Sequence, residues 1–415
     1  MTKPAAICSN ILKDTDTYPL PAYRSVLKNM KKLLALFLLI MLLFQAALAE
    51  PARDVTMQVG LEAPGATANV RNTRDNDEES GMGIPGGSKQ YVYIIPADDP
   101  VAAVYIEYGL TLSSFDVEVK TENGWQVIAH SDNPGYAQVS LSFAPQSERF
   151  RLHFTTLQRG DKLSIREMRV YTEGELDEAL VHNWLPAPDK ADILFLVAHP
   201  DDELLWFGGA IPDSVDRGKS VQVVYLTCAD KQRRLELLNG LWRCGVRTYP
   251  EIGNFRDFKG KQEKILDSWG RKTVRAWIVT AIRRYKPEVI VTHDLKGEYG
   301  HPQHIVCSKL LEECVTLAAD PSYRPDTGEA WQVKKVYRHL GTTPTTKLDW
   351  DQPLSSFNGE TGIEIARAAM EFHVSQISRW KVAAAGDQYD STLYTLIYST
   401  VGEDTTGNDL FEHID

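Results

Sequence analysis

Two short stretches of the sequence place acids and histidines where an apolar strand gives way to a helix. The first follows the apolar run 193–198 and contains His199, Asp201, Asp202 and Glu203. Adjacent carboxylates repel one another, and a bound cation would remove that cost. His199 and Asp202 are three residues apart, so on the first turn of a helix they share one face and can hold one metal ion. Asp201 then points elsewhere and is placed to act as the general base for an attacking water.

The second stretch, 293–304, follows another apolar run, 289–292, and ends in a second histidine pair. His301 and His304 are again three residues apart, and Pro302 is favoured at the first position of a helix. His304 would complete a set of two imidazoles and one carboxylate, which is typical of a catalytic zinc site, with iron(II) as the alternative metal. The alternative for the first stretch is a capped helix start without a metal.

Together the two stretches resemble the LmbE/PIG-L family of zinc-dependent N-acetylglucosaminyl deacetylases. The resemblance rests on Ala198–Glu203 followed by Tyr299–His304, and it extends from about residue 191 to about residue 315. It implies hydrolysis of an N-acetyl amide bond by a metal-activated water. The family positions correspond here to His199, Asp202 and His304 as metal ligands, Asp201 as base and His301 as the residue that stabilises the oxyanion or protonates the leaving amine. We add Tyr299, whose hydroxyl can reach the oxyanion.

One position departs from the family pattern. The family usually has Asp between the proline and the last histidine of the second motif, and this chain has Gln303. We interpret that Asp as an orienting partner of the first histidine, here His301. Glutamine cannot stabilise an imidazolium by charge, so we expect a lower pKa for His301 than in relatives with Asp. Gln303 and Glu203 are both expected to support the metal ligands from behind; the alternative for Glu203 is an acid favoured at a helix start.

Further residues are candidates for the site because they are similar to family segments or because they stand at a strand end near it. Arg233 and Glu236 are similar to the family's Arg-x-x-Glu helix, which would make Arg233 face the substrate; the alternative is a solvated helix face. His373 echoes a late His-x-Ser-Gln segment, and we expect it to be structural or to lie at the rim of the site. His293 and Asp294 stand at a strand end near the site without an assigned role.

The elements that must position these residues alternate between strand and helix. This order predicts an α/β, Rossmann-like parallel-sheet catalytic domain over 191–415. No glycine-rich nucleotide fingerprint follows the first strand. The expected strands are 193–198, 221–227, 248–252, 289–292 and 333–338, with a closing strand after residue 390, and the expected helices are 203–217, 230–244, 271–285 and 302–318.

Residues 50–175 show short, alternating, β-rich runs that predict an antiparallel jelly-roll or sandwich domain. The domain resembles the galactose-binding-like modules of the discoidin type, many of which bind glycans. Trp125 and Tyr136 are candidates for stacking on a sugar, and the alternative is an ordinary core or rim position. The segment 71–88 is expected to be a loop, and 176–190 a linker. The expected strands are 91–95, 103–107, 115–119, 125–128, 138–142, 150–154 and 165–171.

The first 49 residues have the pattern of an export signal. Met30 and two lysines precede the apolar run 33–44, and Ala47–Ala49 is a small-x-small cleavage site. We expect cleavage after Ala49, with translation starting either at Met1 or at Met30; the alternative is an uncleaved anchor. Both place the enzyme outside the cytoplasmic membrane, secreted or at the cell surface.

Charge and cysteine content narrow the function further. The net charge is −11 over 415 residues, and no basic run follows the signal segment, which excludes nucleic acid as an expected partner. The four cysteines after Ala49 have no CxxC spacing and predict neither a disulfide framework nor a cysteine-bound zinc. We expect an exported zinc-dependent deacetylase of N-acetylglucosamine-containing glycans or glycoconjugates, with membrane contact only through an uncleaved signal segment. The alternatives are a zinc amidohydrolase of another N-acyl substrate and a glycan-binding surface protein.

Overall fold

The computed structural model describes residues 50–77, 79–87, 89–109, 111–228 and 230–414. Contacts between Cα atoms divide the chain into two compact units. In the small unit, residues 50–53 and 174–176 are joined by backbone hydrogen bonds from Ala52 N to Glu175 O and from Glu175 N to Glu50 O. The large unit holds the remaining described residues. The predicted signal segment, 1–49, lies outside the described residues.

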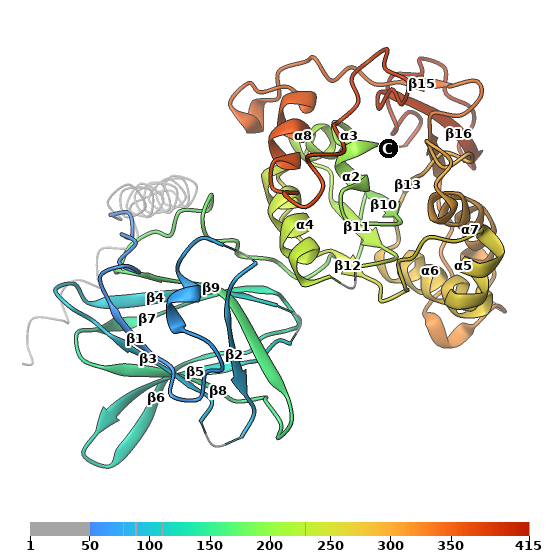
Figure 1. Ribbon diagram of the computed structural model, residues 1–415. Helices are drawn as coiled ribbons and strands as arrows, with labels where there is room; N and C mark the ends of the chain where they lie inside the picture. Colours follow the sequence, from blue (N-terminus) through green and yellow to red (C-terminus); the bar gives the residue numbers. More distant parts are fainter. Residues whose placement is uncertain (1–49, 78, 88, 110, 229, 415) are drawn as a thin grey trace, which may run out of the picture. The chain divides into compact units, whose positions relative to one another are not determined.

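Residues 54–173 of the large unit form an all-β domain of two antiparallel sheets (Figure 1), as the alternating pattern predicts. One sheet has the strand order β1-β3-β8-β5-β6, and the other β2-β9-β4-β7. Buried side chains from both sheets form one apolar core, because every second residue of a strand points to the same face. The strands are β1 (Gly60–Glu62), β2 (Met82–Pro85), β3 (Tyr91–Ile95), β4 (Val101–Tyr108), β5 (Phe115–Thr121), β6 (Gly124–Ser131), β7 (Gln138–Gln146), β8 (Phe150–Phe154) and β9 (Lys162–Tyr171).

The prediction of an unstructured loop over 71–88 is wrong in part. This segment contains β2, which pairs with β9 in register Met82 to Ile165, and most of the 3-10 helix η1 (Val70–Thr73). Met82 and Ile84 are fully buried in the sandwich core. The glycines around them conceal the strand in the sequence, because glycine has low intrinsic strand preference and adds no side chain to the pattern.

The α/β part is built on one seven-stranded sheet with the order β12-β11-β10-β13-β14-β16-β15. The first five strands of that order run parallel, and β16 and β15 are antiparallel additions. The sequence predicts the five parallel strands and the closing strand, although β12 is shorter than expected. The strands are β10 (Ile193–Val197), β11 (Val221–Tyr225), β12 (Glu251–Ile252), β13 (Val289–Thr292), β14 (Lys335–His339), β15 (Thr346–Lys347) and β16 (Leu393–Ser399).

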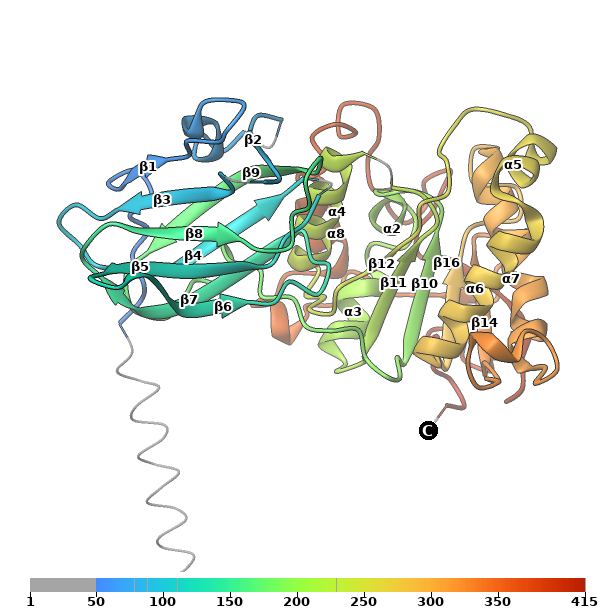
Figure 2. The same cartoon turned by 90° about the horizontal axis from the view of Figure 1, so that it is seen from below.

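Helices cover both faces of this sheet, which Figure 2 shows with α4 and α8 on one side and α5, α6 and α7 on the other. Alternate residues of β10 enter the two cores: Phe195 packs in the cluster that contains α4 and α8 side chains, and Leu194 and Leu196 pack against α6 and α7. The helices are α2 (Asp202–Leu205), α3 (Ala210–Asp216), α4 (Lys231–Arg243), α5 (Gln262–Trp269), α6 (Arg271–Tyr285), α7 (Pro302–Ala319) and α8 (Gly362–Met370), with 3-10 turns η2 (Pro325–Thr327) and η3 (Ser355–Phe357).

The single helix predicted over 203–217 is wrong, because the chain forms the short α2 and then α3. Gly208 and Gly209 lie in the break and touch other segments closely. A Cβ on Gly208 would meet the Ala366 Cβ at 2.6 Å, and one on Gly209 would meet the Trp350 indole at 2.0 Å. The two glycines therefore let the break pack against α8 and the indole, and the first turn after β10 becomes an independent, tightly held element.

The strand order reverses between the adjacent parallel strands β10 and β13. In open α/β sheets, ligands bind outside the carboxyl ends of the strands at such a point. The first motif follows β10 and the second follows β13, so both meet at that edge. Among the described residues, no helix combines the length and apolar character needed to cross a membrane.

Candidate metal and catalytic site

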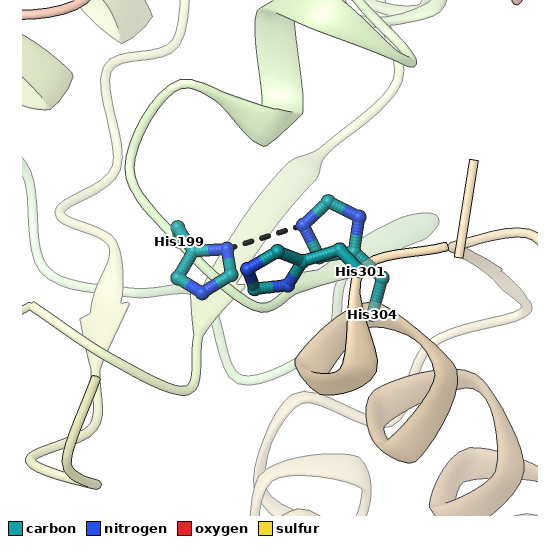
Figure 3. A group of neighbouring side chains, drawn as sticks. All are labelled: His199, His301 and His304. Atoms are coloured by element: carbon teal, nitrogen blue, oxygen red, sulfur yellow. Dashed lines mark hydrogen bonds between the residues drawn. The ribbon is translucent and has the colours of Figure 1, made fainter. Parts of the chain in front are cut away.

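Three predicted ligands converge at the carboxyl ends of β10 and β13. His199 Nδ1 is 3.2 Å from His304 Nε2 and 3.1 Å from Asp202 Oδ2, and His304 Nε2 is 3.2 Å from Asp202 Oδ1. All three side chains are buried. Figure 3 shows His199 facing His304 and His301 from the start of α7, with the His199–His304 contact dashed. The structure therefore brings together two imidazoles and one carboxylate from segments about a hundred residues apart.

Local hydrogen bonds fix the direction of the Asp202 carboxylate. The backbone N–H of His199 donates to Oδ2 at 2.7 Å, and the indole N–H of Trp206 donates to Oδ1 at 2.9 Å. Asp202 is the first residue of α2, so its side chain reaches back over the turn that carries His199. Both carboxylate oxygens are thereby held toward the two imidazoles without closing the space between them.

Glu298 is a site residue that the sequence analysis missed. Its side chain is fully buried, its backbone has a positive φ of 52°, and its carboxylate accepts a hydrogen bond from His304 Nδ1 at 2.6 Å. His293 Nδ1 and His339 Nδ1 also lie 3.2 Å from it. A carboxylate behind an imidazole fixes its tautomer and raises its basicity as a metal ligand. The only signal in the sequence was a charged residue directly before Tyr299.

Gln303 contacts His199, so the expectation that it orients His301 is wrong. Its amide N–H donates to Arg256 O at 3.1 Å, which turns the amide oxygen toward His199 Nε2. A carbonyl oxygen only accepts, so His199 carries its proton on Nε2 and leaves a lone pair on Nδ1. Gln303 therefore contacts a candidate metal ligand, His199, and not the histidine that the sequence analysis assigned to it.

The donor set fits a divalent metal. With Gln303 and Glu298 accepting from the outer nitrogens, His199 Nδ1 and His304 Nε2 both direct lone pairs at the space beside the Asp202 carboxylate. Three acceptors that face one another without a proton between them repel one another, and a bound cation would remove that repulsion. His301 and His293 are also close enough to be grouped with these ligands. His293 Nε2, however, accepts the backbone N–H of Ala198 at 3.0 Å, which uses its lone pair.

Asp201 lies beside the ligands and does not join them. Its backbone is left-handed, with φ 102° and ψ −29°, which is uncommon for a residue other than glycine. Its carboxylate is 3.1 Å from Arg233 Nη2. Burial, followed by the charge of Asp202, raises the pKa of the Asp201 carboxyl above its ordinary value, and Arg233 offsets part of this. The geometry leaves Asp201 buried and adjacent to the metal ligands.

Arg233 faces the site, so the alternative of a solvated helix face is excluded. It stands in the first turn of α4, which Asp230 caps by accepting from the N–H groups of Gln232 and Arg233. Besides Asp201, its guanidinium donates to Pro200 O and lies 3.9 Å from Asp257. A hollow of about 250 Å³ opens beside these groups, and it is lined by Pro200, Thr227, Cys228, Asp230, Arg233 and Asp257.

His301 and Tyr299 stand at the open side of the site. His301 is the N-cap residue of α7, half-buried, with its Nδ1 lacking a hydrogen-bond partner among the described residues. Burial, and then the neighbouring His304 and His199, lower the pKa of His301 to about 3. The Tyr299 side chain is 41% exposed, and its ring packs on Trp380 with centroids 4.6 Å apart. Trp380 carries no signal in the sequence, because it comes from a distant loop.

The other candidates have supporting positions. Glu203 accepts the Asp201 backbone N–H at 2.9 Å, and His373 is completely buried behind it, not at the rim. Asp294 accepts the N–H groups of Lys296 and Gly341 and so holds the loop after β13. In the sandwich, the Arg151 guanidinium lies 4.0 Å from the Trp125 ring centroid, so one face of that indole is already covered.

Residues 194–315 match the family model described as PIG-L, GlcNAc-PI de-N-acetylase. The chain carries a PIG-L family deacetylase domain. Enzymes of this family hydrolyse N-acetyl amide bonds and are typically metal-dependent, and the PIG-L match includes both motifs and every ligand candidate discussed above. The resemblance seen in the sequence is thus confirmed.

Two curated relatives share one description. A 1D-myo-inositol 2-acetamido-2-deoxy-alpha-D-glucopyranoside deacetylase from Nocardioides sp. is 28% identical over 251 residues, which cover 45% of this chain and 83% of the relative. A protein of the same description from Geodermatophilus obscurus is 31% identical over 177 residues, covering 35% of this chain and 60% of the relative. The chain thus spans less than two thirds of the second relative's length.

Two solved structures are similar to portions of the chain. N,N'-diacetylchitobiose deacetylase from Pyrococcus horikoshii is 20% identical, with a TM-score of 0.35, and the match covers 45% of this chain and 71% of that one. The family 32 CBM of C. perfringens NanJ, solved with galactose, is 11% identical, with a TM-score of 0.25, and the match covers 29% of this chain and 98% of that module.

Proposed function

We propose that this protein is a metal-dependent N-deacetylase that removes the acetyl group from N-acetylglucosamine in a glycan or glycoconjugate. The observation that carries the proposal is the convergence of His199, His304 and Asp202, with Asp201 beside them. Zinc is the proposed metal, since two imidazoles and one carboxylate with an open position are its usual catalytic ligands, and iron(II) is the alternative. The family match and the description of the relatives support this chemistry.

The metal would supply Lewis-acid polarisation of the acetamide carbonyl and acidification of the attacking water. Asp201 takes the proton from that water. Its carboxylate is adjacent to the ligand set without belonging to it, and Arg233 holds one of its oxygens. Burial excludes bulk water from this carboxylate, so its basicity is directed at the reacting molecule. Asp201 then has a proton to return when the carbon–nitrogen bond breaks.

His301 and Tyr299 act on the other side of the reacting carbonyl. Attack on the amide places negative charge on the carbonyl oxygen, and that oxygen needs donors. His301 projects from the start of α7 beside His304, with a nitrogen that no described residue uses. We assign it to the oxyanion or to the departing amine. Tyr299 stands next to it, with ring centroids 5.7 Å apart, and its hydroxyl is proposed as a second donor.

The hollow beside Arg233 and Asp257 is the proposed place for the sugar. A guanidinium and a half-exposed carboxylate offer donors and acceptors to vicinal hydroxyl groups. The sequence relatives are described as acting on an inositol-linked 2-acetamido-2-deoxyglucoside. We propose the same sugar for this chain. The experiment below determines which group is linked to that sugar.

The test measures acetate release by the chain from Glu50 to Asp415. The substrates are inositol-linked N-acetylglucosamine, N,N'-diacetylchitobiose, longer chitooligosaccharides, free N-acetylglucosamine and peptidoglycan fragments. Each is offered to the metal-stripped protein and again after zinc or iron(II) is restored. Asp201→Asn is the matched control, because it keeps the size of the side chain and removes its basicity.

Metal-dependent release that Asp201→Asn abolishes would establish the deacetylase and rank its substrates. Stoichiometric metal binding without release from any of these sugars would redirect the search to other N-acyl amides. Absence of both metal binding and release would overturn the proposal and leave 199–202 as a capped helix start.

We further propose that the enzyme acts outside the cytoplasmic membrane. The support is the sequence pattern of two lysines after Met30, the apolar run 33–44 and the small residues at 47 and 49. Expression in a bacterial host with a C-terminal tag tests this. A mature protein that begins at Glu50 in the extracytoplasmic fraction is expected, whereas a full-length soluble cytoplasmic product would contradict the proposal.

A further inference from the structure

A buried carboxylate stands directly behind the base. Glu203 is completely buried, and its Oε2 accepts the backbone N–H of Asp201 at 2.9 Å. Its other oxygen, Oε1, has no hydrogen-bond partner among the described residues. A buried carboxylate with one unsatisfied oxygen is costly unless a donor or a cation lies close by. Glu203 Oε1 therefore requires a hydrogen-bond donor on the side away from the candidate metal ligands.

His373 faces that free oxygen, and the buried Tyr225 hydroxyl also lies close to the Glu203 carboxylate. His373 Nε2 is 3.5 Å from Glu203 Oε1, and the histidine side chain is completely buried. Neither ring nitrogen has a hydrogen-bond partner among the described residues. A hydrogen bond between Glu203 Oε1 and His373 Nε2 would satisfy both of these buried polar atoms. A displacement of a few tenths of an ångström gives a normal hydrogen bond from His373 to Glu203.

The segment that carries His373 is fixed to α4 by a second carboxylate. Glu236 is completely buried and accepts from Ser375 N at 2.9 Å and from Ser375 Oγ at 2.6 Å. A helical glycine makes room for the ring, because a Cβ on Gly240 would lie 3.1 Å from His373 Nε2. The helix that directs Arg233 at Asp201 thus also places His373 behind Glu203.

We propose that Glu203 and His373 form a positioning pair for the base Asp201, an inference that rests on the proposed function. His373 donates to Glu203, and Glu203 in turn holds the Asp201 peptide N–H. This hydrogen bond keeps Asp201 in its left-handed backbone conformation. Neither residue touches the substrate or the metal ligands through its side chain, so both act through Asp201.

The backbone conformation is what makes such a pair necessary. A residue other than glycine pays a steric cost at φ 102°, and the conformation persists only if its surroundings hold it. Relaxation to a negative φ would swing the Asp201 side chain away from Arg233 and from the reacting water. A misplacement of about 1 Å in a catalytic group can cost about 10²-fold in rate. His373 is thus linked to the rate through one peptide group.

The experiment compares His373→Leu with His373→Gln in the metal-loaded chain. Leucine removes the donor, while glutamine restores an N–H to Glu203. We expect His373→Leu to lower kcat by about 10²-fold with little change in KM and with full metal content, and His373→Gln to recover most of the rate. His182→Leu is the matched control, because His182 is also buried and packs on the Trp242 ring at 4.7 Å, away from Asp201.

A crystal structure of His373→Leu gives a readout that does not require activity. A shifted Asp201, with its N–H released from Glu203, supports the pair even if no tested sugar is hydrolysed. An unchanged Asp201 backbone overturns it. So does a loss of thermal stability in both His373 variants with kcat per metal-loaded molecule preserved, since that outcome assigns His373 to packing alone. Failure of the proposed function would show separately, as absence of acetate release by the unmodified chain.

Discussion

Each of the three candidate metal ligands has a further polar group that is hydrogen-bonded to a fixed neighbour. His199 is held through Gln303, His304 through Glu298, and Asp202 through the Trp206 indole and the His199 backbone. The neighbours leave the inner atoms directed at a common point. These six hydrogen-bonding side chains form a preorganised candidate cation site. Mutations of the three supporting residues are therefore expected to matter as much as mutations of the three candidate ligands.

The charge of Glu298 is expected to matter for metal affinity. Glu298→Gln keeps an acceptor for His304 Nδ1 but removes the negative charge, so zinc affinity should fall about 10–100-fold. Competition with a chromogenic chelator measures the dissociation constant. Glu312→Gln on the exposed face of α7 is the matched control, since Glu312 forms an ion pair with Arg338 and lies outside the site. Equal affinities for the two variants would contradict the role of Glu298.

Alanine substitutions of His301 and of His304 are expected to affect metal content differently, because only His304 is hydrogen-bonded to a supporting carboxylate, that of Glu298. His301→Ala should keep one metal per chain and lower kcat by about 10²–10⁴-fold, as for loss of a general acid or base. His304→Ala should lose the metal. Metal analysis after gel filtration, paired with acetate release, provides the measurement. Loss of metal from His301→Ala would instead place His301 in the ligand set.

At the scale of elements, the site depends on two strand-to-helix turns that begin at the same sheet edge. The turn after β10 is short and rigid because α2 ends after one turn, and the break behind it packs on Trp350 and on α8. The turn after β13 is longer, and Asp294 and Glu298 hold it from within. The packing of the first turn can therefore be tested by substitutions that leave the candidate metal ligands and catalytic residues unchanged.

Gly209→Ala tests that packing. The backbone of Gly209 has φ −69°, which alanine adopts readily, but the new Cβ would lie 2.0–2.4 Å from the Trp350 indole. Overpacking of this kind should lower the free energy of unfolding by about 1–3 kcal/mol. Chemical denaturation measures the loss. The same substitution in a Trp350→Leu background should cost much less, and an equal cost in both backgrounds would show that the indole is not the cause.

At the scale of the whole molecule, a bound metal would join the turn after β10 to the start of α7. Those segments carry His199 with Asp202 and His304, and they follow the adjacent parallel strands β10 and β13. A ligand that binds only the folded state adds stability of RT ln(1 + L/Kd), where L is the free ligand concentration, which is about 2.7 kcal/mol at a free metal concentration 100 times the dissociation constant. The metal should therefore contribute to the stability of the α/β part as well as to catalysis.

Metal removal is accordingly expected to lower the thermal midpoint by several degrees. Calorimetry of the chain with zinc and then with excess chelator measures this shift, and restored zinc should reverse it. The same protocol on His304→Ala serves as the control and should show no response to chelator. A chelator effect of equal size in that variant would mean that the stabilising metal binds elsewhere.

The sequence by itself determined the chemistry and the succession of elements. The strand runs, the His-x-x-Asp and His-x-x-His spacings and the family resemblance depend on residues close together along the chain, where periodicity and helix geometry act directly. They sufficed to predict β10, β13, α4, α6 and α7 and to bring His199, Asp202 and His304 forward as candidate ligands, but not Glu298 or Trp380. The alternating runs likewise sufficed for the sandwich strands, except β1 and the glycine-flanked β2.

The tertiary structure alone decided which atoms meet. Gln303 contacts His199 from 104 positions away, His339 reaches Glu298 from the next strand, and His373 comes to Glu203 from a loop after α8. The break between α2 and α3 depends on an indole supplied by residue 350. Such contacts are set by packing and by the need to pair buried polar groups, and neither leaves a periodic trace in a single sequence.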